Sequence, residues 1–288
     1  MDQIICVVGS TATGKTKKAL ELASTHPSIL VSADSRQVFK GMDIVPGKDH
    51  PKDVPVYGID LVSPDKSCSV SVWYDAVAPH ISAAIATGKQ VIVVGGTGLY
   101  VKAITDGIET MSVPINQALR NELVPLSITK LQERLMSVDK NKFESMNHSD
   151  QLNPRRLVRA IEIASSVNKV PNFVLQSSEL SGRSIKIIGL KYNDSNLQKL
   201  QIHSRVLSRL DLGAVEETKI LLNKYSEGVQ SMSAIGYKSI IKYLTGEFTK
   251  DQMIDAWVND EMAYVKRQMT WFRKVKSIQW SEIDQLGA

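Results

Sequence analysis

The sequence predicts an α/β fold in which a parallel sheet, flanked by helices, carries an all-helical insertion. Short apolar runs alternate with amphipathic stretches over the first hundred residues, which is the rhythm of βαβ units. After Gly107 this rhythm stops, and residues 115–180 carry apolar residues at helical spacing instead. One more apolar run, Ile185–Leu190, then returns the chain to the sheet.

The elements of the core follow from these runs. Before the insertion we expect strands at 3–8, 29–33 and 90–95 and helices at 15–25 and 69–87. Pro79 in the second helix indicates a bend or a break, because proline removes a helical hydrogen bond. After the insertion we expect a strand at 185–190 and long helical segments at 195–224, 233–245 and 250–276. The core is therefore assigned to residues 1–112 and 183–288, and the insertion to residues 113–182.

Composition is that of an ordinary globular protein. Of the 288 residues, 43% are hydrophobic and 23% are charged, and no apolar run approaches the roughly 20 residues that a membrane span needs. The start of the chain lacks the basic region of a secretion signal. Cys6 and Cys68 do not have a metal-binding spacing, and so few cysteines are typical of a reducing compartment. We expect a cytoplasmic, monomeric protein that does not enter the membrane.

Positive charge is concentrated in the later part of the chain. Residues 1–110 contain 10 Lys/Arg and 11 Asp/Glu, and the remainder contains 25 and 19. A positive surface gains free energy when it releases the condensed counterions of a polyanion, which favours a nucleic-acid partner for this part. Solvated helix faces would give the same count, so charge alone leaves both interpretations open.

A phosphate-binding loop is predicted at Gly9–Thr16. The segment matches the pattern G-x-x-x-x-G-K-S/T directly after an apolar strand and directly before an amphipathic helix. In such a loop the backbone N–H groups and the positive end of the helix face phosphate oxygens, Lys15 adds a charge, and the Thr16 hydroxyl can ligate Mg²⁺. The core is thus predicted to resemble P-loop NTPases, with nucleotide or ATP binding typical of the motif. The predicted ligand-binding residues are Gly9, Ser10, Thr11, Ala12, Thr13, Gly14, Lys15 and Thr16.

The loop does not identify its phosphate compound. A nucleotide-hydrolysing enzyme usually has a second strand that ends in an Asp for Mg²⁺. Here the candidate strand ends in Gly95-Gly96-Thr97-Gly98 without a carboxylate, which argues against a motor ATPase. A small-molecule kinase and an enzyme that releases diphosphate as a leaving group both fit.

Asp34 is the candidate carboxylate of the site. It follows the second strand, and residues just past the carboxyl ends of parallel strands face the ligand crevice. Beside the phosphates, Asp34 could ligate Mg²⁺, accept a proton from a nucleophile or cap the next turn. Spacing alone does not choose among these three roles.

Two further segments carry positive charge at helical spacing. Arg156 and Arg159 lie three positions apart, so their guanidinium groups could clamp phosphate oxygens or simply keep the helix soluble. Segment 266–276 interleaves five cations with Trp271 and Phe272, a mixture typical of proteins that hold single-stranded RNA. A helix that packs its apolar face in the core would show the same pattern of residues.

Six motifs occur in order along nearly the whole chain. They are Gly9–Thr16, Asp34-Ser35-Arg36-Gln37-Val38, Gly95-Gly96-Thr97-Gly98-Leu99-Tyr100, Arg156-x-x-Arg159-Ala160, Ala234-Ile235-Gly236-Tyr237 and Lys266–Arg273. This series resembles the motifs of the tRNA dimethylallyltransferases. The sequence shows no C-terminal zinc module such as the eukaryotic members carry, and in this it resembles the bacterial members. The resemblance implies transfer of a dimethylallyl group from dimethylallyl diphosphate to N6 of the adenosine 3′-adjacent to the anticodon, with Mg²⁺ as cofactor and diphosphate released.

The resemblance also implies roles for individual residues. Asp34 would act as the general base for N6, with Lys15 and Thr97 at the diphosphate and Thr16 as the Mg²⁺ ligand. Contact with the tRNA anticodon stem-loop is assigned to Asp34, Ser35, Arg36, Gln37, Arg155, Arg156, Arg159, Arg267, Trp271 and Arg273. The helical insertion would close over the anticodon arm, and the target adenine would leave its stack to reach the loop.

Three alternatives stay open. A small-molecule P-loop kinase would use Arg156 and Arg159 as a lid and Asp34 as base. Prenyl transfer to free AMP or ATP would use the same loop, but the basic C-terminal helix and the insertion argue against it. An RNA-binding protein without catalysis would leave the intact Lys15–Thr16 pair without a role.

Overall fold

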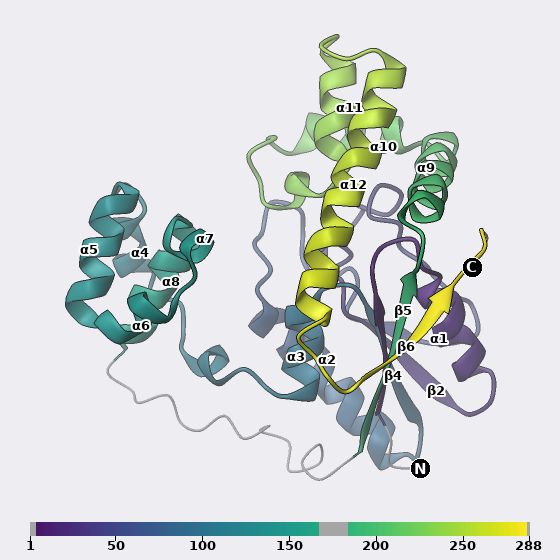
Figure 1. Cartoon of the computed structure of the whole chain (residues 1–288), viewed down its shortest axis with the longest axis horizontal. Helices are drawn as coiled ribbons and strands as arrows, with labels where there is room; N and C mark the ends of the chain where they lie inside the picture. Colours follow the sequence, from purple (N-terminus) through teal and green to yellow (C-terminus); the bar gives the residue numbers. More distant parts are fainter. Residues whose placement is uncertain (1–3, 167–183, 287–288) are drawn as a thin grey trace. The chain divides into compact units, whose positions relative to one another are not determined.

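A parallel sheet forms the centre of this computed structural model, which describes residues 4–166 and 184–286. In these residues its strands are β1 (Ile4–Gly9), β2 (Ser28–Ser32), β3 (Val56–Tyr57), β4 (Gln90–Gly95), β5 (Ile185–Tyr192) and β6 (Ile278–Ile283). They lie in the order β3-β2-β4-β1-β5-β6, and each neighbouring pair is parallel. The predicted α/β class is confirmed (Figure 1).

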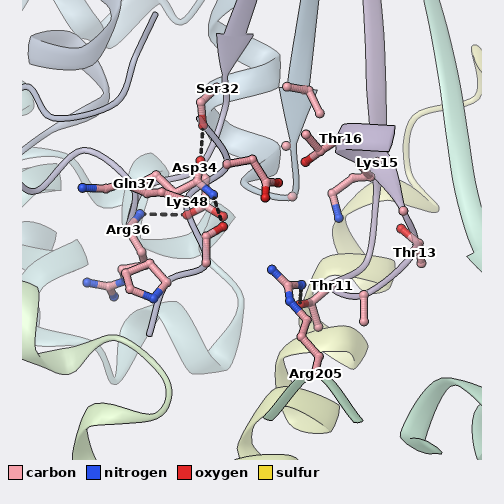
Figure 2. Close-up of a pocket in the computed structure, with 18 of the residues that line it drawn as sticks. Thr11, Thr13, Lys15, Thr16, Ser32, Asp34, Arg36, Gln37, Lys48 and Arg205 are labelled. Carbon is pink, nitrogen blue, oxygen red and sulfur yellow. Dashed lines mark hydrogen bonds between the residues drawn. The ribbon is translucent and has the colours of Figure 1, made fainter. Parts of the chain in front are cut away.

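The strand order brings three connecting loops to one edge of the sheet. Strand β4 lies between β1 and β2, so the loop after β4 lies between the other two. The Ala33 N–H donates to the Val94 carbonyl at 2.8 Å, and the Thr97 N–H donates to the Ala33 carbonyl at 3.1 Å. The carboxyl ends of parallel strands face the ligand crevice. Figure 2 shows side chains from the loops after β1 and β2 in this region.

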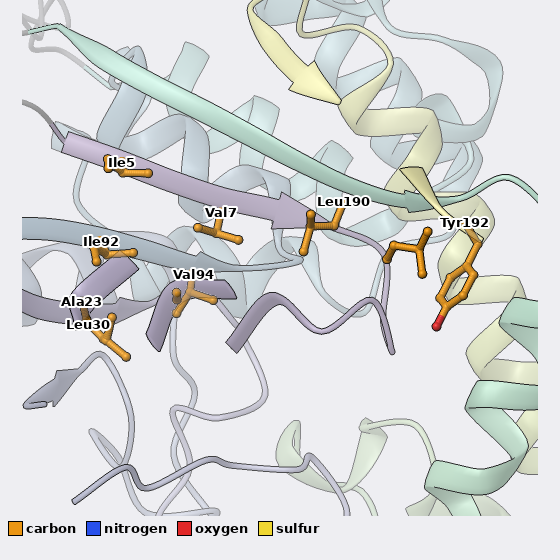
Figure 3. Close-up of a cluster of buried hydrophobic side chains, with 10 residues drawn as sticks. Ile5, Val7, Ala23, Leu30, Ile92, Val94, Leu190 and Tyr192 are labelled. Atoms are coloured by element: carbon orange, nitrogen blue, oxygen red, sulfur yellow. The ribbon is translucent and has the colours of Figure 1, made fainter. Parts of the chain in front are cut away.

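Both faces of the sheet are covered by helices, as a parallel sheet requires. Ile5 and Val7 of β1 pack with Ala19 and Ala23 of α1 (Lys15–Ala23) in one buried cluster (Figure 3). Alternate residues of a strand point to the opposite face, and Cys6 is buried there. Helix α2 (Val70–Ala86) contacts β2 and β4 but contributes nothing to that cluster, so it covers the second face.

Five further helices complete this unit: α3 (Gly98–Thr105), α9 (Ser195–Asp211), α10 (Ala214–Lys224), α11 (Tyr237–Leu244) and α12 (Lys250–Phe272), with the short η2 (Ser231–Ser233). Helix α12 begins with a capping box formed by Thr249 and Gln252. It packs along α9 and reaches β1 and α3 (Figure 1). Within the described residues, none of the helices combines the length and apolar composition that a membrane crossing requires.

The insertion is a separate compact unit, Gly107–Gln176, whereas the sequence places its bounds at 113 and 182. Its described part consists of η1 (Glu109–Ser112), α4 (Gln117–Leu123), α5 (Ile128–Val138), α6 (Lys140–Ser145), α7 (His148–Gln151) and α8 (Pro154–Ala164). Helices α4 to α8 each begin after a side chain that accepts an N–H of the first turn, namely Asn116, Ser127, Asp139, Asn147 and Asn153. The predicted helical stretch beyond 166 lies outside the described residues up to 183.

Several elements differ from the sequence-based expectation. Strands β3 and β6 are not predicted, because β3 has two residues and β6 is an edge strand that buries only Ile278 and Ile283. The predicted helical segment 195–224, which contains a turn signal at Gly213, is two helices that separate at this glycine, whose φ is 100°. Pro79 lies inside α2, which continues through it.

Candidate functional site

The loop Gly9–Thr16 joins β1 to α1 at the carboxyl edge of the sheet. Ala12 and Gly14 have left-handed φ values of 63° and 71°, which turn the backbone ahead of α1. The Ser10 carbonyl accepts hydrogen bonds from Thr13 Oγ1 at 2.8 Å and from Lys15 Nζ at 2.6 Å. Because α1 begins at Lys15, its positive end lies at the loop, which suits an anion.

Side chains from the C-terminal part of the chain fasten this loop. Gln198 of α9 donates to Ser10 Oγ at 2.7 Å, and Arg205 of α9 donates to Thr11 Oγ1 at 3.2 Å. Gln268 of α12 accepts the Thr11 N–H at 2.9 Å and donates to the Gly96 carbonyl at 3.1 Å. The Thr11 amide therefore points to Gln268 rather than to a ligand, and the shape of the loop depends on α9 and α12.

Lys15 is the cation of the loop. Burial and, next, the positive charge of Arg205 lower the pKa of Lys15 to about 8, against the opposing effect of Asp34 and Glu261. A lowered lysine pKa means that the site disfavours positive charge in the absence of a counter-ion. An anion bound here would remove that cost.

A cavity of about 1090 Å³ opens beside the loop, which is enough for a small ligand and part of a second one. Residues 11–16 line it, whereas Gly9 and Ser10 lie behind the lining. Other lining residues come from the turn after β2 and from α9 and α12, among them Asp34, Ser35, Arg36, Gln37, Arg205, Arg209, Glu261, Tyr264 and Arg267. Figure 2 shows Lys15, Thr16 and Asp34 among these side chains, and Arg205 beside Thr11.

Asp34 stands at the cavity with one of its oxygens engaged. Its Oδ1 accepts the Arg36 N–H at 2.8 Å, so the side chain caps the turn after β2. Thr97 does not line the cavity. Its hydroxyl accepts the Ser35 N–H at 3.1 Å, which fixes the residue next to Asp34. Burial, followed by the negative charge of Asp34, raises the pKa of Tyr264 to about 12, and a hydrogen bond with Thr97 opposes that rise.

Arg36 and Gln37 line the cavity but also hold neighbouring segments. The Arg36 guanidinium donates to the Gln230 carbonyl at 3.1 Å. The Gln37 side chain accepts the Ser32 hydroxyl at 2.7 Å and donates to the Gly47 carbonyl at 3.0 Å. Both polar atoms of Gln37 are thus used within the protein, which makes it a support of the cavity wall.

The end of α12 carries the three remaining predicted residues of this unit. Arg267 lines the cavity and lies over the Tyr264 ring at 5.5 Å. Trp271 is 38% exposed and packs on Gly98, where an added Cβ would lie 2.0 Å from the indole. Arg273 is exposed at the C-cap. The apolar side of the helix is buried through Phe272 and Val265, so the core and the exposed-cation interpretations of this segment both apply.

In the insertion unit the three predicted arginines have different surroundings. Arg159 donates to the Thr110 and Val113 carbonyls at 2.7 and 3.0 Å and pairs with Glu162. Arg156 pairs with Asp150, and its side chain is 58% exposed. Arg155 is exposed on the same helix. Arg159 therefore has an internal structural role, whereas Arg155 and Arg156 present their charge at the surface.

Glu162 is the centre of that internal network. It is 2% exposed and accepts the Asn116 N–H at 2.7 Å and two hydrogen bonds from Arg120 at 2.8 and 2.9 Å. Burial alone would raise the pKa of the carboxyl, but the hydrogen bonds from Arg120, Arg159 and the Asn116 amide lower it below its ordinary value. The network joins α8 to the start of α4.

Sequence reasoning did not find several residues of the cavity. Arg205, Arg209 and Glu261 belong to amphipathic helices whose polar positions look like solvated faces, and Gln268 stands inside a predicted motif without an assigned role. The same holds for Gln198, which does not line the cavity but holds Ser10 of the loop. The one available signal was the spacing of Arg205 and Arg209, which places two cations on one helical face.

This chain is similar in sequence to a family model and to enzymes that carry the same name. The family model described as IPP transferase matches residues 37–275. A tRNA dimethylallyltransferase of an Exiguobacterium strain is 34% identical over 277 residues, which cover 94% of this chain and 87% of the relative. The tRNA dimethylallyltransferase 2 of Geotalea uraniireducens is 36% identical over 292 residues, covering 97% and 92%.

A solved structure has the same fold over almost the same length. The full-length tRNA isopentenylpyrophosphate transferase of Bacillus halodurans superposes with a TM-score of 0.70 at 30% identity, covering 99% of this chain and 92% of that one. The family model, the sequence relatives and this structure all point to the same family. The chain therefore belongs to the IPP transferase family.

Proposed function

We propose that this chain transfers the dimethylallyl group of dimethylallyl diphosphate to N6 of the adenosine 3′-adjacent to the anticodon in tRNA and releases diphosphate. The observation that carries the proposal is that Lys15 and Asp34, from the loops after β1 and β2, line one cavity. An anion at Lys15 and a nucleophile at Asp34 would meet in that space. The names of the relatives given above state the same two partners of the reaction, a prenyl group and tRNA.

The loop is suited to stabilise the leaving group. As the allylic C–O bond breaks, negative charge accumulates on the diphosphate oxygens. Fixed N–H donors of the loop, the positive end of α1 and the Lys15 ammonium would stabilise that charge at the moment it forms. The lowered pKa of Lys15 supports this role, because it marks a site that favours an anion.

The residues present fit a magnesium ion. Mg²⁺ prefers oxygen ligands and is commonly held by one or two protein groups together with substrate phosphates. The Thr16 hydroxyl lies in the cavity lining at the start of α1, and the Asp34 carboxylate lines the same cavity. Thr16 is the proposed protein ligand. When bound, Mg²⁺ would neutralise charge on the diphosphate.

Asp34 is the proposed base. An exocyclic adenine amine is a weak nucleophile and must lose a proton when the new C–N bond forms. One Asp34 oxygen holds the turn through the Arg36 N–H, which fixes the orientation of the carboxyl group. The second oxygen would accept the proton from N6.

Each of the two units carries exposed groups that we propose contact tRNA. Arg267, Trp271 and Arg273 lie along the end of α12, and Arg155 and Arg156 lie on the insertion unit. Cations would hold the phosphate backbone, and a planar group would receive an unstacked base. The target adenine would be flipped out of its stack to reach Asp34.

The test is incubation of the full chain and Mg²⁺ with unmodified tRNA and dimethylallyl diphosphate, followed by mass analysis of the nucleosides. We expect one adenosine per susceptible tRNA to gain C₅H₈. Parallel reactions with AMP and with ATP as acceptors distinguish transfer to a free nucleotide. Prenylation of AMP or ATP without prenylation of tRNA, or ADP formation from ATP, would overturn the proposal.

A further inference from the structure

A buried ion pair lies in the wall of the cavity. Arg209 Nη1 of α9 and Glu261 Oε1 of α12 are 3.1 Å apart, and both side chains are less than a tenth exposed, at 7% and 8%. Both residues line the cavity. Replacing a buried ion pair with apolar groups of similar volume is often neutral or stabilising, so stability alone does not explain this pair.

The surroundings hold the Arg209 guanidinium in one place. It lies 5.9 Å from the centroid of the buried Trp257 ring, and Nη2 donates to the Pro46 carbonyl at 3.3 Å. A guanidinium has five N–H donors, and the bonds to Glu261 and Pro46 account for two of them. A fixed, planar cation with remaining donors at a cavity is suited to binding phosphate oxygens.

Arg205 lies one helical turn before Arg209 and reaches the same place. An added Cβ at Gly47 would lie 2.5 Å from Arg209 Nη2 and 2.7 Å from Arg205 Nη2, so both guanidinium groups lie against this glycine. Arg205 itself donates to the neutral Thr11 hydroxyl. Two guanidinium groups therefore share this wall of the cavity with one carboxylate, that of Glu261.

The charges at this wall repel one another in the absence of a ligand. Burial and then the charge of Arg205 lower the pKa of Arg209 to about 10, and Arg205 also lowers the pKa of Lys15. The positive charge of Lys15, Arg205 and Arg209 exceeds the negative charge of Glu261 and Asp34. A ligand with two or more negative charges would relieve this repulsion, whereas a neutral ligand would not.

We propose that Arg209 binds the diphosphate directly, opposite Lys15, and that Glu261 is the positioning residue that holds its guanidinium at the cavity. This inference rests on the proposed function for the identity of the anion. In the free protein Glu261 supplies the counter-charge of Arg209. In the complex the diphosphate shares that role, so binding strengthens where Glu261 is lost and weakens where Arg209 is lost.

The test measures binding of inorganic pyrophosphate to the full chain by calorimetry, together with the shift that pyrophosphate produces in the thermal unfolding midpoint. The double variant Arg209→Met with Glu261→Gln removes both charges without leaving either one unpaired. We expect it to lose at least about tenfold in pyrophosphate affinity, as loss of a charge-assisted hydrogen bond implies. The KM for dimethylallyl diphosphate should rise by a similar factor, and the KM for tRNA should not change.

The single variant Glu261→Gln tests the positioning role. Its unfolding midpoint should fall without ligand, and pyrophosphate should raise that midpoint by more than it does in the wild type, because the anion replaces the missing counter-charge. The catalytic constant should fall, since the guanidinium is no longer held in one orientation. A merely structural pair would lower the midpoint but leave the pyrophosphate-induced shift at its wild-type value.

The matched control is Lys219→Met with Glu216→Gln, which removes an exposed pair of the same charges on α10. It should change neither the affinity nor the shift. Should the Met-containing double variant fail to fold, Arg209→Gln with Glu261→Gln retains a polar pair and decides in its place. Wild-type pyrophosphate affinity in the folded double variant would overturn the role of Arg209. Wild-type protein that binds pyrophosphate but does not prenylate tRNA would instead overturn the proposed function alone.

Discussion

The side chain of Gln268 accepts a hydrogen bond from the Thr11 backbone N–H at 2.9 Å, across 257 positions of sequence. The same side chain donates to the Gly96 carbonyl, so one amide of α12 connects the loop after β1 to the loop after β4. The helix that carries the proposed RNA-binding cations thus also sets the shape of the phosphate-binding loop. Changes along α12 are therefore expected to act on both substrates.

Gln268→Leu should affect the loop while keeping the volume of the side chain. It leaves the Thr11 N–H and the Gly96 carbonyl without their partner, and one unsatisfied buried group costs roughly 1–3 kcal/mol. We expect a loss of that size in denaturant unfolding and a higher KM for dimethylallyl diphosphate. Gln279→Leu on the exposed side of β6 is the control. Wild-type stability and KM in Gln268→Leu would show that the loop holds its shape without this contact.

Asp34→Asn separates the base from the cap. Asparagine keeps an oxygen for the Arg36 N–H but cannot take up a proton, so the turn should persist while turnover falls by at least about 100-fold. Pyrophosphate affinity should stay near the wild-type value. Asp34→Ala, which removes both functions, serves for comparison. If Asn were nearly as active as Asp and only Ala were impaired, the carboxyl group would be a cap and not a base.

The pKa of Lys15 predicts a pH dependence of diphosphate binding. The charged form binds the anion, and this group has a pKa of about 8 in the free protein. Because pyrophosphate itself titrates in this range, the measure is the affinity of the wild type relative to that of Lys15→Arg. This ratio should be constant below that pH and decrease as the pH rises through it. Lys15→Arg stays charged between pH 7 and about 9.5. A ratio that is flat over this range would mean that Lys15 does not contact the ligand.

Removal of Arg273 and Lys276 should weaken tRNA binding in a salt-dependent way. Both side chains are exposed near the end of α12. Loss of two phosphate contacts should reduce the slope of log K against log salt by roughly 1 to 2. Binding is measured by fluorescence anisotropy with unmodified tRNA across a salt series, for Arg273→Ala with Lys276→Ala. The same change at Lys219 and Lys224 of α10 controls for net charge, and an equal effect there would contradict a specific role for α12.

Glu162→Gln should destabilise the insertion unit and change its response to acid. The folded pKa of Glu162 is below its ordinary value of 4.5, so the carboxylate contributes stability that is fully present above that value. The contribution is lost as the pH falls through the lowered folded pKa. Urea unfolding of the full chain between pH 7 and pH 3 should show a steeper loss for the wild type than for the variant. If the stability of the variant and of the wild type fell in parallel with pH, Glu162 would not be the source of the loss of stability in acid.

The motif at Gly9–Thr16 was predictable because its residues are contiguous and its strand–helix context is local. The same holds for Asp34, whose position follows from a strand end. The role of Gln268 was not predictable, since its partners Thr11 and Gly96 come from distant segments that only the sheet order brings together. The sequence also cannot separate Arg159, which is bound inside the insertion, from Arg156, which is exposed three positions earlier.

The sequence did not predict the strand β6, most of whose side chains are not buried. Strand β6 hides only two side chains at the edge of the sheet, so its apolar pattern is too weak to be read as a strand. The burial of Arg209 and Glu261 was not predicted for a related reason, because charged residues on amphipathic helices are normally solvated. Their burial depends on the packing of α9 against α12, which no local pattern encodes.

The dependence of Thr11 on Gln268 has a consequence for biosynthesis. The ribosome delivers the loop 257 positions before the residue that satisfies its amide, and β6, the outer strand beside β5, follows that residue. A polypeptide that terminates early, before α12, would carry the complete loop motif and yet lack a finished ligand site. Incomplete translation products should therefore neither sequester dimethylallyl diphosphate nor compete with the mature enzyme for it.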